Sequence, residues 1–552
     1  MVRTSLALSV TTRCAVAARC ALAAFVIIVS EALAAASQAT TSPINLQADQ
    51  PVSIRFFGSS TADLFTREVD ESFNGVLQKN FVEQASNGFP AGFVNASPAG
   101  QPWAGTMWTR DSGTYLRELT MRGYYEHASL VAECLMNQVE KNEAGFYSFP
   151  RFFRGSKAAS GTEVDGTSSI VIGMVLLWER LSEGNPTRDH IRAFLFQDAS
   201  PLNYFQYLLQ NKPLVAGTGE FGCGMKIQGE CYNVVQNDLA MLALLSAANM
   251  ATQFGREDVA SNDRALATKL WDGMEKYLVD QDGSWIWCID VKTLKPNPAI
   301  LNATVNRGFG GIDGLGSMYA DVLGFRPLAS PWKNADRNEK TLNRLYGTPS
   351  RKLQFDHYGI WTQFDALAGG LLSSPSYGQG YAIQTMLLDD NMTMADKALS
   401  FLANATYQPI PEYKLTRDSP YYFYERLYSP DAVGKVALEA GCGALNLVNV
   451  TEPLKISRIL LGVDDSSLEQ VAIVPRIPAG WQGVEAHHWP IRTRRGVIRA
   501  DIVFERKGTG YKFALTLAKG EVIDDLKVRM PSADGFVWRE QKHTNSVRLQ
   551  TQ

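Results

Sequence analysis

The chain carries, at residues 107–113, the stretch Met107-Trp108-Thr109-Arg110-Asp111-Ser112-Gly113. It brings an aromatic ring, a guanidinium and a carboxylate close together, ahead of a segment with helical periodicity. A pyranose ring offers apolar C–H faces that an indole covers, and hydroxyls that a planar guanidinium and a carboxylate bind. The stretch therefore favours a sugar-binding site at the start of a helix. The alternative is a buried Arg110–Asp111 pair that only stabilises the helix start.

Residues 1–36 have the pattern of a secretory signal. Arginines precede the apolar run 20–29, and Ala32-Leu33-Ala34 provides a small-x-small cleavage signature. The apolar run is short for a bilayer span, which makes an uncleaved anchor the less favoured alternative. We therefore predict a secreted or periplasmic protein with no membrane association after the signal is cleaved.

The composition is that of a folded, weakly acidic protein. The 552 residues are 45% hydrophobic and 20% charged, which is enough for a large core and a second domain. The net charge is −3, and loss of the leader's three arginines and one glutamate takes it to −5. This balance disfavours nucleic acid and anionic membranes as partners. No C-x-x-C or H-E-x-x-H pattern predicts a metal site, and no cofactor is expected.

Five of the seven cysteines lie beyond the leader. Cys223 and Cys231 lie in and beside a glycine-rich loop, so a disulfide between them is one prediction for an oxidising compartment. Buried thiols are the alternative, which we favour for Cys134, Cys288 and Cys442.

Residues 65–450 show helical patterns separated by long loops rich in glycine and aromatic residues. The segments 170–181 and 238–251 are almost entirely apolar, which is typical of helices covered on all sides. Residues 265–278 alternate charged and apolar side chains at a helical period, as an outer helix would. We therefore predict two concentric layers of helices. Long structured loops in compact domains are usually functional, so we expect the site in these loops.

The pattern changes to strands after Asn449. Residues 497–505 alternate at period two, residues 507–510 form a turn, and residues 511–517 return as a partner strand. Further strands are expected within 471–489 and 522–530. The predicted organisation is a signal at 1–36, an extension at 37–64, a helical catalytic domain at 65–450 and a β domain at 451–552, with the boundary near Thr451.

Glycosidic bond cleavage normally needs two carboxyl groups, and the strongest candidate for one of them is Glu425. It lies beside Arg426 in Tyr421-Tyr422-Phe423-Tyr424-Glu425-Arg426-Leu427-Tyr428. The alternative is an ion pair between Glu425 and Arg426 beneath an aromatic cover.

Three acidic residues are candidates for the second carboxyl group. Glu220 lies in a glycine-dense loop in which the backbone can approach a ligand closely. Glu230 precedes the next helix and would equally well stabilise its positive end. Asp165, in Thr162-Glu163-Val164-Asp165, would equally well be the N-cap of a helix that begins near Thr167. The sequence favours Glu220 over Glu230, and Glu230 over Asp165.

Further loops combine polar groups with aromatic rings that can stack on a sugar. For each residue in them a structural role is at least as strong an interpretation. The candidate substrate-binding residues are Trp108, Arg110, Asp111, His357, Trp361, Tyr377, Gln379 and Tyr424.

The order of these motifs resembles the six-hairpin (α/α)6-toroid glycosidases, chiefly the glucoamylase-like and α-L-rhamnosidase-like families. The W-x-R-D stretch comes first, then Val164-Asp165-Gly166, then a Glu-containing loop, then Glu425 and a β domain. The resemblance implies that Arg110 and Asp111 hold the terminal sugar, that Glu220 or Glu230 is the acid, and that Glu425 is the base. It also implies a toroid of six helical hairpins followed by a smaller β-sandwich-like domain.

The chain also departs from these families. It lacks the W-E-E acid motif and the L-P-E-Q base motif of glucoamylases and the R-D-E-R signature of rhamnosidases, although Tyr424-Glu425-Arg426-Leu427 is similar to the rhamnosidase W-E-R-W element. Taken together, the sequence predicts a secreted, inverting exo-glycoside hydrolase that acts on a carbohydrate substrate. The alternatives are a toroidal polysaccharide lyase, with His357 and Tyr358 supplying the base, and a non-catalytic glycan-binding protein.

Overall fold

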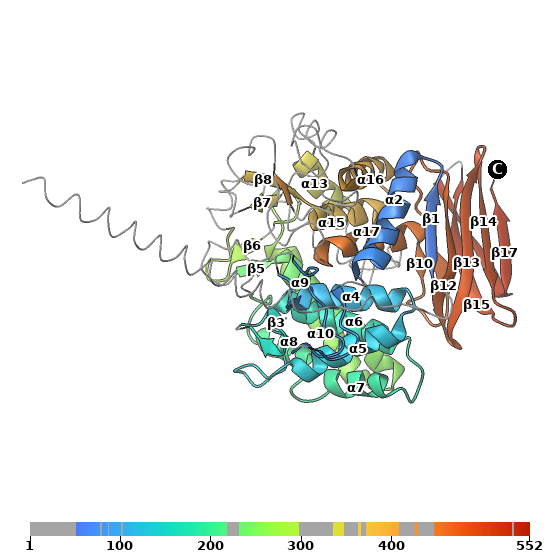
Figure 1. The fold of residues 1–552 in the computed structure, drawn as a ribbon. Coiled ribbons are helices and arrows are strands. Elements are labelled where there is room, and N and C mark those ends of the chain that lie inside the picture. Colours follow the sequence, from blue (N-terminus) through green and yellow to red (C-terminus); the bar gives the residue numbers. More distant parts are fainter. Residues whose placement is uncertain are drawn as a thin grey trace, which may run out of the picture.

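The computed structural model describes residues 51–77, 80–86, 88–100, 103–159, 161–217, 231–286, 288–296, 335–346, 363–365, 371–407, 426–428, 447–532 and 535–551. The leader expected at 1–36 lies outside these residues. The described chain consists of a helical region followed by β-sheets (Figure 1).

The inner helices of the helical region are buried on nearly every side. In sequence order, α4 packs against α6 and α6 against α9, while α15 packs against α17 and α17 returns to α4. Every residue of α4 is buried, as is almost every residue of α6. The apolar segments that predict fully covered helices are therefore confirmed. The inner helices are α4 (Thr109–Met121), α6 (Val164–Trp178), α9 (Val234–Gln253), α15 (Ser376–Leu388) and α17 (Leu447–Leu461).

The outer helices each cover one of these inner helices. In α10 the buried residues Ala260, Ala267, Leu270 and Met274 lie on one face, as the helical spacing of apolar residues predicts. The pairs are α4 with α5 (Tyr125–Gln138), α6 with α7 (Pro186–Leu195), α9 with α10 (Glu257–Tyr277) and α15 with α16 (Met392–Tyr407), while α2 (Ser60–Asp70) packs on α16 and α17. The remaining described helices are η1 (Glu71–Leu77), α8 (Pro201–Leu208) and α13 (Ala335–Tyr346).

Glycines allow α4 and α6 to approach closely. A Cβ at Gly113 would come within 2.5 Å of Ser169, and a Cβ at Gly173 would lie 2.9 Å from the carbonyl oxygen of Gly113. The hydroxyl of Ser169 donates to the Arg110 carbonyl at 3.1 Å. These contacts hold the two helices together beyond their first turns, and the first turn of each helix carries candidate site residues.

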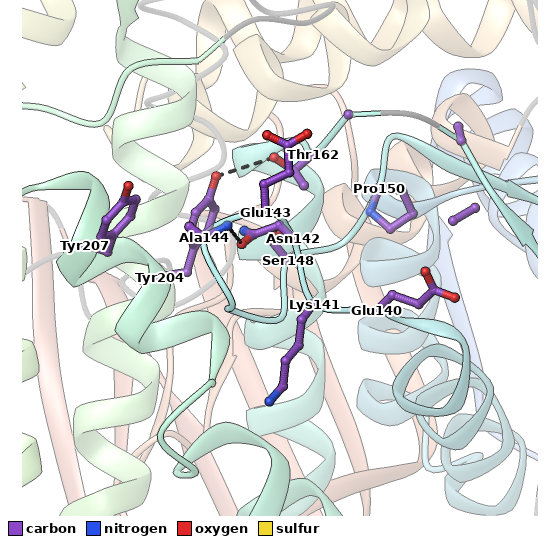
Figure 2. A pocket seen from close by; sticks show the side chains of 13 residues that line it. Glu140, Lys141, Asn142, Glu143, Ala144, Ser148, Pro150, Thr162, Tyr204 and Tyr207 are labelled. Carbon is purple, nitrogen blue, oxygen red and sulfur yellow. Dashed lines mark hydrogen bonds between the residues drawn. The ribbon is translucent and has the colours of Figure 1, made fainter.

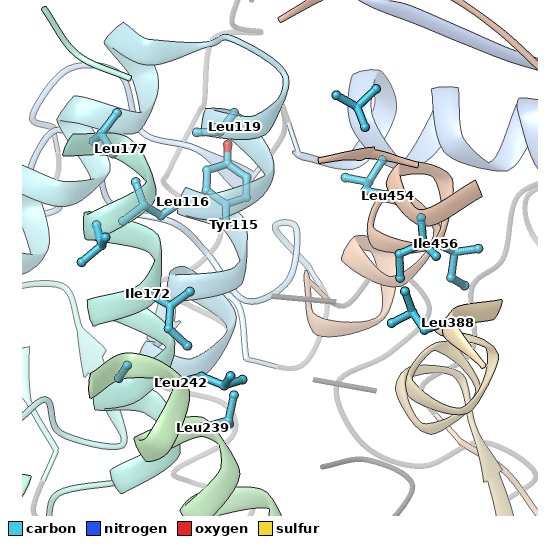
Figure 3. Close-up of a cluster of buried hydrophobic side chains, with 14 of the residues drawn as sticks. Tyr115, Leu116, Leu119, Ile172, Leu177, Leu239, Leu242, Leu388, Leu454 and Ile456 are labelled. Carbon is cyan, nitrogen blue, oxygen red and sulfur yellow. The ribbon is translucent and has the colours of Figure 1, made fainter. Parts of the chain in front are cut away.

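Apolar side chains fill the interior between the inner helices (Figure 3). Leu116 of α4, Ile172 of α6 and Leu242 of α9 are fully buried on one side of this core. Leu388 of α15 and Ile456 of α17 are fully buried on the other. Helix α9 is long and apolar enough to cross a membrane, yet it lies within this core.

Two sheets follow the helices. One has the strand order β1-β12-β13-β14-β17 and the other β10-β11-β15-β16. The predicted hairpin is confirmed, since β13 and β14 pair with Val503 opposite Ala514. The strands of the first sheet are β1 (Ser53–Phe57), β12 (Gly483–Thr493), β13 (Gly496–Lys507), β14 (Gly510–Leu517) and β17 (Ser546–Gln550); those of the second are β10 (Val463–Asp464), β11 (Val471–Ile473), β15 (Ile523–Ser532) and β16 (Gly535–Thr544).

Two boundaries differ from those that the sequence predicts. Helix α17 continues through Thr451 and has Pro453 in its interior, so the change to strands comes at Gly462. Packing of α17 against α4 and α15 outweighs the helix-breaking tendency of the proline. The expected N-terminal extension contains β1, which pairs with β12 and so joins the C-terminal sheet.

The C-terminal sheets lie at one end of the helical region, and three small sheets lie at the other (Figure 1). The small sheets supply the strands that lead into inner helices: β2 precedes α4, β5 precedes α9 and β8 precedes α15. The starts of these helices therefore share the end that faces away from the β domain. The small-sheet strands are β2 (Thr106–Trp108), β3 (Phe152–Arg154), β4 (Lys157–Ala158), β5 (Cys231–Asn233), β6 (Cys288–Asp290), β7 (Gln363–Asp365), β8 (Leu371–Pro375) and β9 (Arg426–Tyr428).

Candidate functional site

The W-x-R-D stretch spans the junction between strand β2 and helix α4. Trp108 ends β2 opposite Phe152, and Thr109 begins the helix. The Thr109 hydroxyl donates to the Pro150 carbonyl at 2.7 Å, which fixes the junction against the neighbouring strand. Arg110 and Asp111 consequently lie in the first helical turn, where the helix dipole favours the carboxylate of Asp111.

Asp165 lies in the corresponding first turn of α6. That helix begins at Val164 with Glu163 at its N-cap position, so the alternative of Asp165 as the N-cap of a helix beginning near Thr167 is wrong. Asp165 is 1% exposed. One of its oxygens, Oδ2, accepts a hydrogen bond from Arg110, while Oδ1 is buried without a hydrogen-bond partner among the described residues.

Arg110 is the centre of a buried charge cluster. Its Nη1 lies 3.2 Å from Asp165 Oδ2 and 3.5 Å from Glu163 Oε2, whereas its Nε lies 3.8 Å from Asp111 Oδ1. Glu163 also contacts Arg151, at 3.2 Å between Oε1 and Nε. Arg110 is therefore bound more closely to the acids of α6 than to its neighbour Asp111, so a simple Arg110–Asp111 brace does not describe the contacts.

The aromatic ring of the stretch is covered. Trp108 is 6% exposed, with the Arg151 guanidinium 4.9 Å from its ring centre and Phe152 5.0 Å away. Trp103 packs edge-on against it at 5.2 Å and is itself 37% exposed. Of these rings, Trp103 is the one most available to a ligand.

A third inner helix contributes polar groups at the same end. The side-chain oxygen of Asn233 caps α9 by accepting a hydrogen bond from the backbone N–H of Gln236 at 2.8 Å. The side-chain oxygen and nitrogen of Gln236 are both buried, with no hydrogen-bond partner in the described part of the chain. A Cβ at Gly217 would collide with the end of this side chain, so a larger residue there would displace it.

Glu220 and Glu230, the preferred acid candidates, lie outside the described residues. The residues on either side of them, Gly217 and Cys231, pair through hydrogen bonds of 3.1 and 3.4 Å beside the start of α9. The described residues that flank both candidates therefore lie beside this helix start.

Glu425 and Tyr424 also lie outside the described residues, as do His357 and Trp361. The neighbour of Glu425, Arg426, begins β9 and pairs with Pro375 at the end of β8. Tyr377 and Gln379 follow in the first turn of α15, where the structure describes the backbone only.

Sequence reasoning missed two residues of the charge cluster, Arg151 and Glu163, and the neighbouring ring of Trp103. Glu163 directly precedes the motif around Asp165, and a carboxylate two positions from a candidate acid was a usable signal. Arg151 and Trp103 had none, because the place of Arg151 depends on the pairing of β2 with β3, and that of Trp103 on edge-on packing against Trp108.

The described residues contain no cluster of three or more His, Cys, Asp or Glu side chains arranged to hold a metal ion. Cys134 is a buried thiol, as expected, and burial raises its pKa to about 12. Cys231 is buried, and its Sγ donates to the Gly217 carbonyl. Cys223 lies outside the described residues, so the Cys223–Cys231 disulfide stays a prediction. Cys288 is disulfide-bonded, so the expectation of a buried thiol there is corrected.

Two solved structures show the similarity of the fold. The α-L-rhamnosidase from Dictyoglumus thermophilum matches with a TM-score of 0.57 and 8% identity over 91% of this chain and 50% of the other. A human-microbiome protein described as a kojibiose phosphorylase matches with a TM-score of 0.51 and 11% identity over 91% of this chain and 63% of the other. The fold of the chain is similar to that of the six-hairpin glycosidases.

This likeness concerns the fold. It confirms the resemblance that the motif order predicts, and it confirms a helical region followed by β-sheets. The chain spans about half the length of the rhamnosidase. No family model matches the chain, and no curated protein sequence is significantly similar to it.

Proposed function

We propose that the protein is a glycoside hydrolase whose active site lies where the inner helices begin. The observation that carries the proposal is the cluster of three buried carboxylates and two guanidinium groups at the starts of α4 and α6. Sugar hydroxyls both donate and accept hydrogen bonds, so they fit such a cluster. The fold supports the same conclusion, because proteins with this fold include a rhamnosidase.

Within the cluster we assign Arg110, Asp111 and Asp165 to substrate binding. Asp165 already accepts a hydrogen bond from Arg110, so we assign it to substrate binding rather than to proton donation. Its second oxygen, which is buried, has no hydrogen-bond partner among the described residues. Exposed Trp103 replaces Trp108 as the ring that contacts the sugar face.

The proton donor is then Glu220 or Glu230, and Glu425 is the general base that activates water. Their described neighbours lie beside the starts of α9 and α15, at the same end of the helical region as the cluster. Inversion requires a separation of roughly 6.5–9.5 Å between the two carboxyl groups, which leaves room for the water. Action on chain ends, and export through the predicted signal, belong to the same proposal.

One observation argues against a polysaccharide lyase. A lyase needs a cation that neutralises a uronate, but Arg110 and Arg151 already contact carboxylates in this cluster. A glycan-binding protein without activity would need no second acid. A phosphorylase, the activity named for one structural neighbour, would need phosphate as co-substrate.

A screen on nitrophenyl glycosides and neutral oligosaccharides, run with and without phosphate, separates these functions. We expect release of free sugar without phosphate and without the ultraviolet absorbance of an unsaturated uronate. Proton NMR of the first product should show the inverted anomer. Phosphate-dependent turnover, an unsaturated product, or turnover of none of the substrates would each overturn the proposal.

A further inference from the structure

A pocket of about 470 Å³ lies on the loop that joins α5 to α6, against helix α8 (Figure 2). We refer to it as the Tyr204–Tyr207 pocket. The chemically active residues that line it are Glu140, Asn142, Glu143, Thr162, Tyr204 and Tyr207. None of these residues takes part in the charge cluster around Arg110.

The pocket carries an aromatic platform. Tyr204 and Tyr207 lie three residues apart on α8, and therefore on one face of the helix, with their ring planes within 17° of each other. Phe146 packs against the Tyr207 ring at 5.4 Å and supports it. Tyr207 is nevertheless 44% exposed. An exposed tyrosine held by a second ring offers an apolar face with a polar tip, which suits the C–H face and hydroxyls of a sugar.

The polar wall of the pocket is preformed. The Asn142 side chain donates to the Ser148 hydroxyl at 2.8 Å and accepts from the amides of Ala144 and Phe146. The hydroxyls of Thr162 and Tyr204 lie 3.4 Å apart. These bonds hold the loop in one shape without a ligand, which lowers the ordering cost of binding.

The charged side chains that line the pocket disfavour anionic ligands. Glu140 and Glu143 line the pocket, and Lys141 is its only lining cation among the described residues. The Lys141 side chain points away from Thr162 and Tyr204 (Figure 2), and its Nζ lies 5.5 Å from the ring of Tyr147. Carboxylates accept hydrogen bonds from sugar hydroxyls but repel uronates, phosphates and sulfated glycans.

The pocket and the charge cluster lie on opposite faces of one pair of extended segments. Pro150 pairs with Thr162, and both line the pocket. The next residues, Arg151 and Glu163, form the ion pair beside Arg110. Successive side chains in an extended segment point to opposite faces, so a ligand in the pocket is separated from the cluster by this wall.

From these observations we propose that the Tyr204–Tyr207 pocket is a second carbohydrate-binding site, which holds a neutral glycan chain beside the catalytic end of the molecule. This second site goes beyond the proposed hydrolysis, since glycan binding in the Tyr204–Tyr207 pocket requires no catalytic group.

Native gel electrophoresis in gels that contain soluble starch, mannan, xylan or polygalacturonate tests the proposal on the full protein. At least one neutral polysaccharide should retard the wild type, and Tyr207→Ala should weaken that binding roughly five- to tenfold through loss of stacking. Phe536→Ala is the matched control, because Phe536 is 49% exposed and lies in β16, outside the pocket. It should bind as the wild type does.

Three results would overturn the second site: no retardation by any neutral polysaccharide, equal retardation of Tyr207→Ala and wild type, or binding of polygalacturonate alone. Turnover of small nitrophenyl glycosides should be unchanged in Tyr207→Ala, and its loss would instead place Tyr207 in the catalytic site. Failure of hydrolysis with intact Tyr207-dependent binding would contradict only the proposed function.

Discussion

Arg110 and Asp165, separated by 55 residues in the chain, meet at 3.2 Å where helices α4 and α6 begin. The contact places the guanidinium of the W-x-R-D stretch against an acid of the next inner helix. It also leaves one oxygen of Asp165 buried without a hydrogen-bond partner in the described structure. We propose that a hydroxyl of the substrate supplies the missing hydrogen bond to this carboxylate.

Arg110→Lys should raise KM for the glycan substrate about tenfold or more with a smaller effect on kcat. A lysine ammonium is a point charge that does not reproduce the planar fork contacting Glu163 and Asp165. Steady-state kinetics measure KM and kcat separately. Arg154→Lys, at an exposed position in the neighbouring strand β3, is the control. Unchanged KM in a folded Arg110→Lys protein would remove Arg110 from substrate binding.

Glu118→Gln should destabilise the fold by about 3–5 kcal/mol, because Arg458 would lose its counter-ion in the core. Both oxygens of Glu118 contact Arg458, at 2.8 and 3.2 Å, and link α4 to α17. Burial opposes ionisation, yet Arg458 and Arg117 lower the pKa of Glu118 below its ordinary value. Urea unfolding measures the change. Glu71→Gln, which removes an exposed pair with Arg67, should cost less than about 1 kcal/mol.

Glu68→Gln should make the protein less sensitive to rising pH. Glu68 is fully buried, and burial raises its pKa from 4.5 to about 8 despite the hydrogen bond from Thr406. The folded state therefore keeps the proton that the unfolded chain releases, so stability is lost as pH rises from about 4.5 to about 8. Glutamine is neutral throughout this range.

Thermal unfolding of the wild type and Glu68→Gln at about pH 5 and about pH 8.5 tests this titration. The gain in stability of the variant over the wild type should be larger at the higher pH, by an amount on the order of a few kcal/mol. Parallel changes of Tm with pH in the two proteins would show that Glu68 is not the responsible group.

His487→Ala with His488→Ala should leave kcat near normal. Both residues lie in β12, His487 opposite Ser53 of β1 and His488 within the irregularity between Ala486 and Trp489. The C-terminal sheets lie at the opposite end of the helical region from the charge cluster (Figure 1). Kinetics and circular dichroism check the outcome, and a loss of several orders of magnitude in a folded double variant would mean that this domain reaches the active site.

Periodicity in the sequence was sufficient to predict the helical layers and the main hairpin. The apolar segment around Ile172 and the alternation around Ile502 follow directly from burial on all sides or on one face. The end of the helical region was not predictable from local rules. Pro453 indicates a break, but packing of α17 between α4 and α15 maintains the helix.

The candidate site was predictable only where neighbouring residues in the sequence form a recognisable motif. Such motifs contain Arg110, Asp111 and Asp165, and the structure brings these three residues together. Arg151 is not part of such a motif, because its place in the cluster depends on the pairing of β2 with β3. The exposure of Trp103, and the covering of Trp108, likewise follow from packing rather than from sequence spacing.

The turnover number of Glu425→Gln, measured on whichever glycoside the wild type cleaves, tests the central claim most directly. The amide keeps the shape of the side chain but does not accept the proton of the attacking water, so kcat should fall by orders of magnitude while substrate binding is nearly retained. Glu469→Gln, at an exposed acid of the β domain, should retain full activity. A Glu425→Gln protein that keeps more than about a tenth of the wild-type kcat would contradict the assignment of Glu425 as the general base.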